Sequence, residues 1–135
     1  HPNIVGVKDS GGDIVQITNI IRSTPEDFSV FAGSGSFLYP TLALGGVGGT
    51  LAVANILPDF CAELAEAVVA GEHSKAVEMQ MKLMEINAAV TSKYGISGLK
   101  AAMDLIGLVG GAPRTPLLPC DQKQIDDIKR MLSAF

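Results

Sequence analysis

The first half of the chain alternates short apolar runs with stretches in which apolar residues recur at helical spacing. The apolar runs cover residues 3–9, 28–34 and 48–55, and the helical stretches cover residues 13–23 and 37–46. The runs lack strict alternation of apolar and polar residues, as is typical of parallel strands that are buried on both faces. This pattern predicts an α/β fold in which three parallel strands are joined by helices.

The second half of the chain has a helical pattern throughout. Helical spacing covers residues 59–71, 72–94, 95–111 and 122–135, and a proline-broken connector occupies residues 112–121. The change in pattern indicates two regions. We predict an α/β region over residues 1–70 and a helical region over residues 71–135.

Each predicted strand ends on a polar or small residue. The first ends at Lys8, the second at Gly33 and Ser34, and the third at Asn55. Parallel strands place their carboxyl ends at one edge, where α/β proteins bind ligands, so we expect these four residues to converge. The pattern fits either a doubly wound sheet or part of a (β/α)8 barrel, since a complete barrel needs about 200 residues or more.

The composition narrows the range of partners. The 135 residues are 47% hydrophobic and carry a formal net charge of −4, and their lysines and arginines form no cluster. Such a chain folds as a globular unit, and we expect neither a nucleic-acid surface nor a site for anionic membranes. No apolar run reaches membrane-spanning length. We therefore expect small solutes or other proteins as partners.

The cysteines and histidines predict no metal site. Cys61 and Cys120 lie far apart without CxxC spacing, and His1 and His73 have no neighbours at ligand spacing. Unpaired cysteines are typical of a reducing compartment. We expect an intracellular location, in the cytoplasm or the mitochondrial matrix.

Lys8 has the clearest potential for chemistry. An ammonium group has no lone pair, so a lysine that attacks a carbonyl must be desolvated or placed beside another cation. A strand end that opens into a pocket offers such a setting. The pattern alone nevertheless favours a lysine whose side chain extends into solvent at the strand end, where the sequence allows an ion pair with Asp9. Ser10 fits either a substrate contact or a helix cap.

Three segments resemble one family in the family's own order. NIVGVKDSGGD resembles the lysine-bearing strand of the N-acetylneuraminate lyase and dihydrodipicolinate synthase family, the Schiff-base aldolases and lyases. FAGSGSFLYPTLALGGVGGTLAVANILP resembles its seventh strand, seventh helix and eighth strand, and GISGLKAAMDLIGLVGGAPRTPLLP its C-terminal helical region. The resemblance implies a partial TIM (β/α)8 barrel, with strands six to eight, followed by a C-terminal helical extension.

The resemblance also implies roles for residues at the strand ends. Lys8 matches the lysine that forms the Schiff base with the substrate. Ser10 and Gly33 match pocket residues, and the backbone of that glycine approaches the bound keto acid. Ser34 lies beside Gly33 and joins the predicted substrate-binding set, whereas Asn55 matches a recurrent asparagine that is either structural or part of the pocket. The covalent lysine imine implies that no metal or other cofactor takes part.

The substrate that the resemblance implies is a small 2-oxo acid of the pyruvate type. Gly35 and Ser36 occupy positions where sialic acid lyases carry an acidic pair, which disfavours a sugar-acid substrate. FAGSGSF and NAAVTSKYGISGLKAAMD resemble most the 4-hydroxy-2-oxoglutarate aldolases, which release pyruvate and glyoxylate. The alternative is 4-hydroxy-tetrahydrodipicolinate synthase, which condenses pyruvate with aspartate semialdehyde. The family also implies a homo-oligomer, with a homotetramer expected.

Two parts of the family's site have no match in these residues. The family uses a tyrosine from the fifth strand to move a proton, and a Ser/Thr pair from the first half of the barrel to bind the substrate carboxylate. We therefore expect this chain to be the C-terminal part of an enzyme and to be inactive alone. A different class of function is a non-catalytic half-barrel that only associates with another chain.

Overall fold

The first half of the chain forms a parallel sheet with a helix after each of its first two strands. The computed structural model describes all 135 residues. The strands, in spatial order, are β1 (Gly6–Asp9), β2 (Ser29–Ala32) and β3 (Gly48–Gly49), and the helices are α1 (Ile14–Ser23) and α2 (Leu38–Ala43). Both strand pairs are parallel, and the register pairs Lys8 with Phe31 and Phe31 with Gly48. The predicted α/β arrangement is confirmed for this region.

Helix α1 begins where its sequence provides an N-terminal cap. The Asp13 carboxylate accepts hydrogen bonds from the backbone N–H groups of Val15 (2.9 Å) and Gln16 (3.2 Å), which would otherwise lack partners in the first turn. Ile17 is fully buried beneath the helix. The helix therefore packs on the sheet through one apolar face, as its spacing predicts.

The third predicted strand is much shorter than its apolar run, and this part of the prediction is wrong. Strand β2 ends at Ala32, so the last ladder hydrogen bond available to β3 runs from the Thr50 N–H to the Ala32 carbonyl (2.8 Å). Beyond that point the chain folds into the 3-10 turn η2 (Val53–Asn55), in which the Asn55 N–H donates to the Ala52 carbonyl at 3.2 Å. Asn55 consequently lies outside the sheet.

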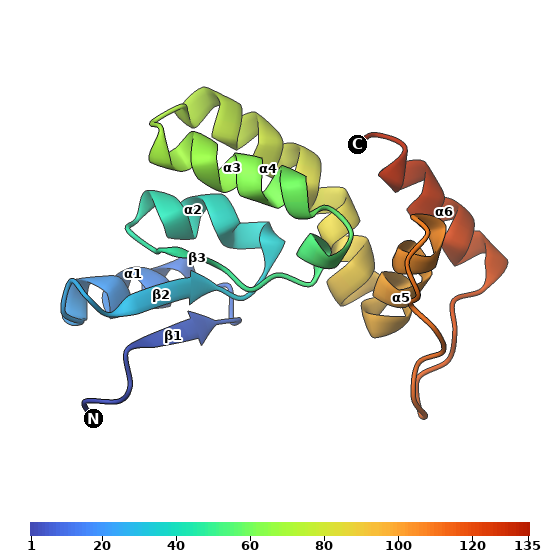
Figure 1. Cartoon of the computed structure of the whole chain (residues 1–135), viewed down its shortest axis with the longest axis horizontal. Helices are drawn as coiled ribbons and strands as arrows, with labels where there is room; N and C mark the ends of the chain where they lie inside the picture. The colour runs from blue at the N-terminus through green and yellow to red at the C-terminus, as the bar shows by residue number, and fades with distance from the viewer.

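Two longer helices cover α2 on the side away from the sheet. Helices α3 (Pro58–Val69) and α4 (His73–Ala88) run side by side, and α2 lies between this pair and the sheet (Figure 1). Gly71, at a φ of 75°, ends α3, and the Glu72 N–H donates back to the Ala67 carbonyl at 2.8 Å. Glycine adopts this left-handed conformation without steric cost, so the chain can reverse within a few residues.

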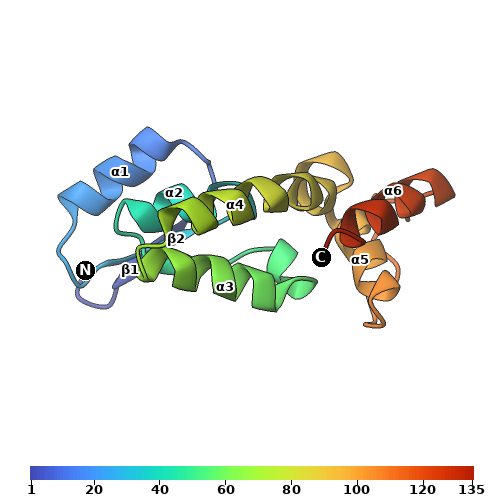
Figure 2. The ribbon, with the colours of Figure 1, turned by 90° about the horizontal axis from the view of Figure 1, so that it is seen from above.

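The C-terminal region forms a separate end of the molecule. A π-helical turn, η3 (Ala89–Lys93), continues α4 and leads into α5 (Gly95–Leu105) and α6 (Gln122–Leu132). Figure 2 shows α5 and α6 at the opposite end from α1. The helix predicted over residues 95–111 is shorter than expected, because Gly107 takes a φ of 84° and the Leu108 N–H closes the last turn onto the Met103 carbonyl.

Charged and polar side chains hold α6 against the end of α4. The Asp127 carboxylate accepts from Lys93 Nζ and from the Tyr94 hydroxyl at 2.7 Å each, and from Arg130 at 3.0 Å. Arg130 also reaches Glu85 on α4 at 2.8 Å. The hydrogen bond from Lys93, followed by those from Tyr94 and Arg130, lowers the pKa of the Asp127 carboxyl. The hydrogen bonds that dock α6 therefore stabilise the charged form of Asp127.

One hydrophobic core runs through both halves of the chain. It contains Ala32, Leu38 and Val53 from the α/β region together with Leu83 and Ile128 from the helical region, all at most 2% exposed. Burying a leucine or isoleucine fully contributes about 1.5–3 kcal/mol. The helical region therefore stabilises the loops at the sheet edge as well as itself.

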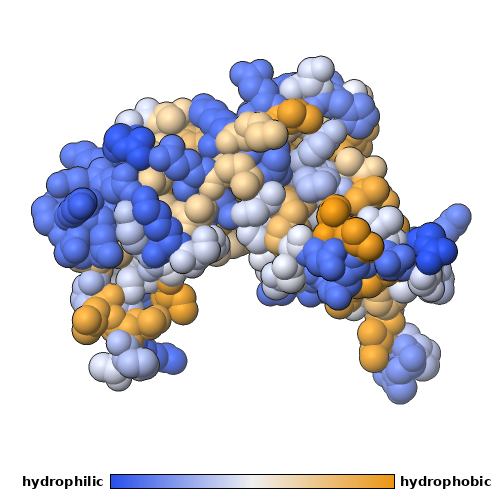
Figure 3. All heavy atoms as spheres, turned by 180° about the vertical axis from the view of Figure 1, so that it is seen from behind, coloured by the Kyte–Doolittle hydropathy of each residue, from blue (hydrophilic) through white to orange (hydrophobic).

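Strand β1 has a neighbour on one side only. Ile4 and Val5 just before it are 64% and 68% exposed, and Val7 within it is 38% exposed. Figure 3 shows hydrophobic residues over both downward projections of the molecule, the N-terminal end and the connector that follows α5.

No helix combines the length and apolarity that crossing a membrane requires.

Candidate active site

The carboxyl ends of β1 and β2 meet in direct contact. The Gly33 N–H donates to the Asp9 carbonyl at 2.6 Å. A Cβ atom placed on Gly33 would lie 2.2 Å from Ser10 Oγ and 2.6 Å from the Asp9 carbonyl oxygen, so any larger residue would force the two strand ends to shift. Because Gly33 has no side chain, Ser10 can lie directly against the end of β2. Ser10 follows Lys8 by two residues.

Lys8 is exposed and forms no ion pair within the chain. The pairing with Asp9 that the sequence allowed is absent, because the Asp9 carboxylate is engaged elsewhere. It accepts from Gln16 Nε2 at 2.6 Å and from the Gly11 N–H at 2.9 Å. These hydrogen bonds, with that from Gln16 the strongest influence, lower the pKa of Asp9. Asp9 thus shapes the turn after β1 and leaves the Lys8 amine free.

The loop after β2 carries Ser34 at its beginning. The Ser34 hydroxyl caps the 3-10 turn η1 (Gly35–Phe37) by accepting from the Ser36 N–H at 3.3 Å. Ser34 is half-buried and directly follows Gly33 at the strand end. The structure therefore brings Ser10, Gly33 and Ser34 to the same edge of the sheet, where Lys8 also lies.

Asn55 lies beyond the end of β3, outside the sheet. Its exposed side-chain amide donates to the Ala52 carbonyl at 2.9 Å, at the end of the turn η2. The expectation that the third strand ends at Asn55 is wrong, because β3 stops six residues before it. A part for Asn55 in the pocket stays a prediction. The contact of its side chain is a local structural one.

Two buried amides on α4 hold the loop after β2, and the sequence reasoning missed both. Gln80 Nε2 donates to the Gly35 carbonyl at 2.8 Å, and Gln80 Oε1 accepts from the Tyr39 N–H at 2.9 Å. Asn87 Nδ2 donates to the hydroxyl oxygens of the loop serines. Gln80 is 6% exposed and Asn87 is fully buried. The sequence did contain a signal for these contacts, because two polar residues lie seven positions apart on the apolar face of a helix, where buried polar groups need partners.

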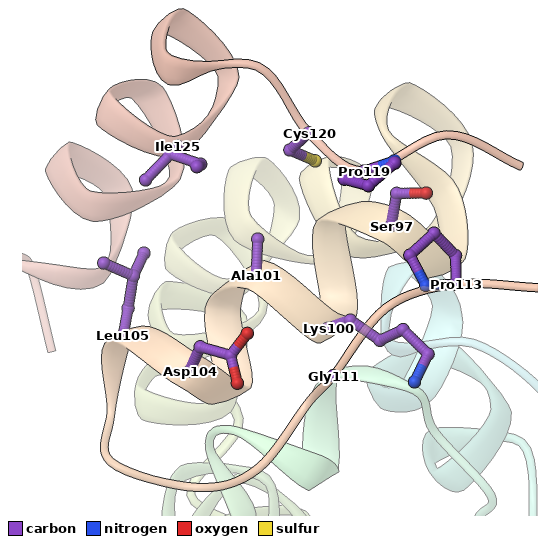
Figure 4. A pocket seen from close by; sticks show the side chains of 10 residues that line it. All are labelled: Ser97, Lys100, Ala101, Asp104, Leu105, Gly111, Pro113, Pro119, Cys120 and Ile125. Carbon is purple, nitrogen blue, oxygen red and sulfur yellow. The ribbon is translucent and has the colours of Figure 1, made fainter.

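One cavity lies in the C-terminal region, away from the strand ends. It has a volume of about 270 Å³ and lies among α5, α6 and the connector (Figure 4). Lys100 donates to the Gly110 carbonyl, and Asp104 accepts from the Gly110 N–H at 2.7 Å, so both charged groups brace the loop. Burial raises the pKa of the Cys120 thiol at the cavity wall, which disfavours the reactive thiolate. No group of three His, Cys, Asp or Glu side chains is placed to hold a metal ion.

The whole chain matches one protein family. Residues 1–135 match the model of the dihydrodipicolinate synthetase family. The 4-hydroxy-tetrahydrodipicolinate synthase of Thermoanaerobacter sp. (strain X514) is 35% identical over 133 residues, which are 98% of this chain and 45% of that protein. The synthase of Archaeoglobus fulgidus is 34% identical over 98% of this chain and 46% of its own length. The chain thus spans about half the length of the curated relatives it matches.

Solved structures agree with this relationship. The dihydrodipicolinate synthase of Bacillus anthracis superimposes with a TM-score of 0.92 at 28% identity, over 98% of this chain and 46% of that one. The enzyme of Thermotoga maritima gives a TM-score of 0.87 at 28% identity, again over 98% and 46% of the two chains. Because the family model covers all 135 residues, the chain belongs to the dihydrodipicolinate synthetase family.

Proposed function

We propose that Lys8 forms a Schiff base with a small 2-oxo acid of the pyruvate type. The observation that carries this proposal is the position of Lys8 at the carboxyl end of β1, two residues before the contact of Ser10 with Gly33. Its amine is free of ion pairs, and α/β proteins bind ligands at this edge of the sheet. Family membership supports the assignment of this lysine as the nucleophile.

The proposed chemistry uses the imine as an electron sink. The neutral Lys8 amine adds to the C2 carbonyl of the keto acid to give a carbinolamine. The carbinolamine takes up a proton on its hydroxyl group and loses water, which leaves a cationic iminium. Removal of a proton from C3, or cleavage of the C3–C4 bond, then leaves its electron pair in a neutral enamine and avoids a free carbanion. The Ser10 hydroxyl can donate to a substrate oxygen, and the bare backbone of Gly33 allows close approach.

We propose that β1, β2 and β3 supply strands six to eight of a (β/α)8 barrel. The half-length match to the relatives and the open edge of β1 support this arrangement. The remaining strands would cover Ile4, Val5 and Val7 and would enclose Lys8, which desolvates the amine and favours its nucleophilic form. The proton-transfer tyrosine and the carboxylate-binding pair would come from that part. On this proposal the chain alone is inactive.

The relatives favour a condensation reaction over the cleavage that the sequence placed first. Their name, 4-hydroxy-tetrahydrodipicolinate synthase, supports the condensation of pyruvate with aspartate semialdehyde. Cleavage of 4-hydroxy-2-oxoglutarate is the second candidate, because residues 31–37 and 87–104 resemble those aldolases. Both reactions pass through the same lysine imine and differ in the carbonyl partner.

An assay of the whole protein separates the two reactions. We expect consumption of aspartate semialdehyde in the presence of pyruvate, and slower release of glyoxylate from 4-hydroxy-2-oxoglutarate. Lys8→Ala should abolish both activities, and the matched variant Lys123→Ala, at an exposed position of α6, should keep them. Faster release of glyoxylate would reverse the order of the candidates. Full activity of Lys8→Ala would contradict the proposed nucleophile.

A further inference from the structure

A fully buried amide on α4 contacts the loop at the strand ends. Asn87 Nδ2 donates to Ser36 Oγ at 2.7 Å and to Ser34 Oγ at 3.2 Å, across more than 50 positions of sequence. Asn87 Oδ1 is buried and has no hydrogen-bond partner. Buried polar atoms without a partner are rare in folded proteins. The amide of Asn87 therefore donates to both serines, while its own carbonyl oxygen stays buried without a donor.

The hydrogen bonds of Ser34 leave its hydroxyl as a donor only. A serine hydroxyl has two acceptor positions and one hydrogen. Both acceptor positions are filled, by Asn87 Nδ2 at 3.2 Å and by the Ser36 N–H at 3.3 Å. The hydroxyl donates to no acceptor within the chain, and Ser34 is half-buried at the strand-end edge. Its hydrogen is therefore available to an acceptor that binds there.

The loop is fixed in this arrangement from behind. A Cβ atom on Gly35 would lie 2.7 Å from Asn87 Oδ1 and 2.9 Å from Val53 Cγ1, so the loop backbone packs tightly against the amide. Gln80 holds the same loop through the Gly35 carbonyl and the Tyr39 N–H. The Ser34 hydroxyl is thus held in place by α4 before any ligand arrives.

We propose that Asn87 is a positioning residue, which keeps the Ser34 hydroxyl as a hydrogen-bond donor to an oxygen atom of the bound substrate. The acceptor is a carboxylate or carbonyl oxygen, the groups that keto acids and their aldehyde partners carry. The inference rests on the proposed function, because that function places a substrate at this edge. Through Ser34, the helical region would then influence substrate binding.

The test removes the hydrogen-bond donor of Asn87 in the whole protein. In Asn87→Asp the carboxylate offers no donor, so the Ser34 hydroxyl turns its hydrogen toward α4 and no longer donates to the substrate. We expect the KM of the keto acid or of the aldehyde to rise about tenfold, with kcat within about threefold of wild type. Ser34→Ala should raise the same KM. Asn19→Asp, at an exposed amide of α1, is the charge-matched control and should leave both KM values unchanged.

The double variant Ser34→Ala/Asn87→Asp decides whether Asn87 acts through Ser34. We expect no further rise in KM beyond that of Ser34→Ala, because the hydroxyl through which Asn87 acts is gone. An equal rise in both backgrounds, or an unchanged KM in Asn87→Asp, would overturn the inference. If thermal unfolding shows that Asn87→Asp does not fold, the neutral Asn87→Leu replaces it in the same cycle.

The proposed function and this inference fail in different ways. If pyruvate and borohydride give no covalent adduct with the wild-type protein, the proposed function is wrong and the inference falls with it. If the adduct forms in wild type and in Asn87→Asp while both KM values stay unchanged, the inference alone is wrong.

Discussion

At the scale of single residues, the contact between Gly33 and Ser10 determines how closely the two strand ends approach. We predict that Gly33→Ala destabilises the chain by about 1–3 kcal/mol, because the added methyl group overlaps Ser10 Oγ and the Asp9 carbonyl oxygen. In the whole protein the same change should slow adduct formation at Lys8. Chemical denaturation and the rate of borohydride trapping measure the two effects.

Gly11→Ala is the matched control for this substitution. Gly11 has a negative φ, and an added Cβ would meet its nearest neighbour, Asp9 Oδ1, at an ordinary 3.5 Å. We expect wild-type stability within about 0.5 kcal/mol. Equal stability and equal trapping rates for Gly33→Ala and Gly11→Ala would show that the close approach of the strand ends has no role.

Sequence reasoning identified the residues at the first two strand ends but not those that support them. Lys8, Ser10 and Gly33 follow apolar runs, so their place at the edge of a parallel sheet could be predicted from the pattern. Asn87 contacts Ser34 from 53 positions away, and nothing local in the sequence specifies that contact. Long-range packing of α4 on the loop determines it.

At the scale of elements, the docking of α6 depends on the charge of Asp127. The pKa of this carboxyl is lowered below its ordinary value of 3.8 by hydrogen bonds from Lys93, Tyr94 and Arg130. A group with a lowered pKa in the folded state contributes stability above its unfolded pKa and loses it as the pH falls toward the folded value. The contribution of Asp127 is therefore fully present at neutral pH.

We predict that Asp127→Asn lowers the free energy of unfolding at pH 7, and that the difference from wild type narrows progressively below about pH 4. Urea unfolding at pH 7, 4 and 3 measures this difference. Asp126→Asn, at an exposed position on the same helix, is the control and should show a smaller effect. A difference for Asp127→Asn that is constant over this pH range would contradict the proposed role of its charge.

The helices were more predictable than the strands. The sequence placed helices over residues 13–23, 59–71 and 122–135, and α1, α3 and α6 occupy those positions. Helical hydrogen bonds are local, so caps and spacing specify them. The length of β3 instead depends on where its partner β2 ends, and the apolar run of β3 carries no signal for that.

At the scale of the whole molecule, the open edge of β1 predicts self-association of the isolated chain. Unpaired strand edges beside exposed apolar residues are sites of intermolecular pairing. We expect a sedimentation coefficient that rises with concentration, and a smaller rise for Val5→Lys, since Val5 is 68% exposed and its replacement adds an edge charge. Val69→Lys, which changes a residue 87% exposed at the end of α3, is the control. A monomer at all concentrations would contradict this prediction.

Borohydride trapping followed by peptide mapping shows which lysine is the nucleophile of the whole protein. The whole protein is incubated with pyruvate and borohydride, digested, and analysed by mass spectrometry. We expect a reduced pyruvate adduct on the peptide that contains Lys8, no adduct in Lys8→Ala, and an unchanged adduct in Lys123→Ala. An adduct on another lysine, or no adduct in the wild-type protein, would contradict the proposed role of Lys8.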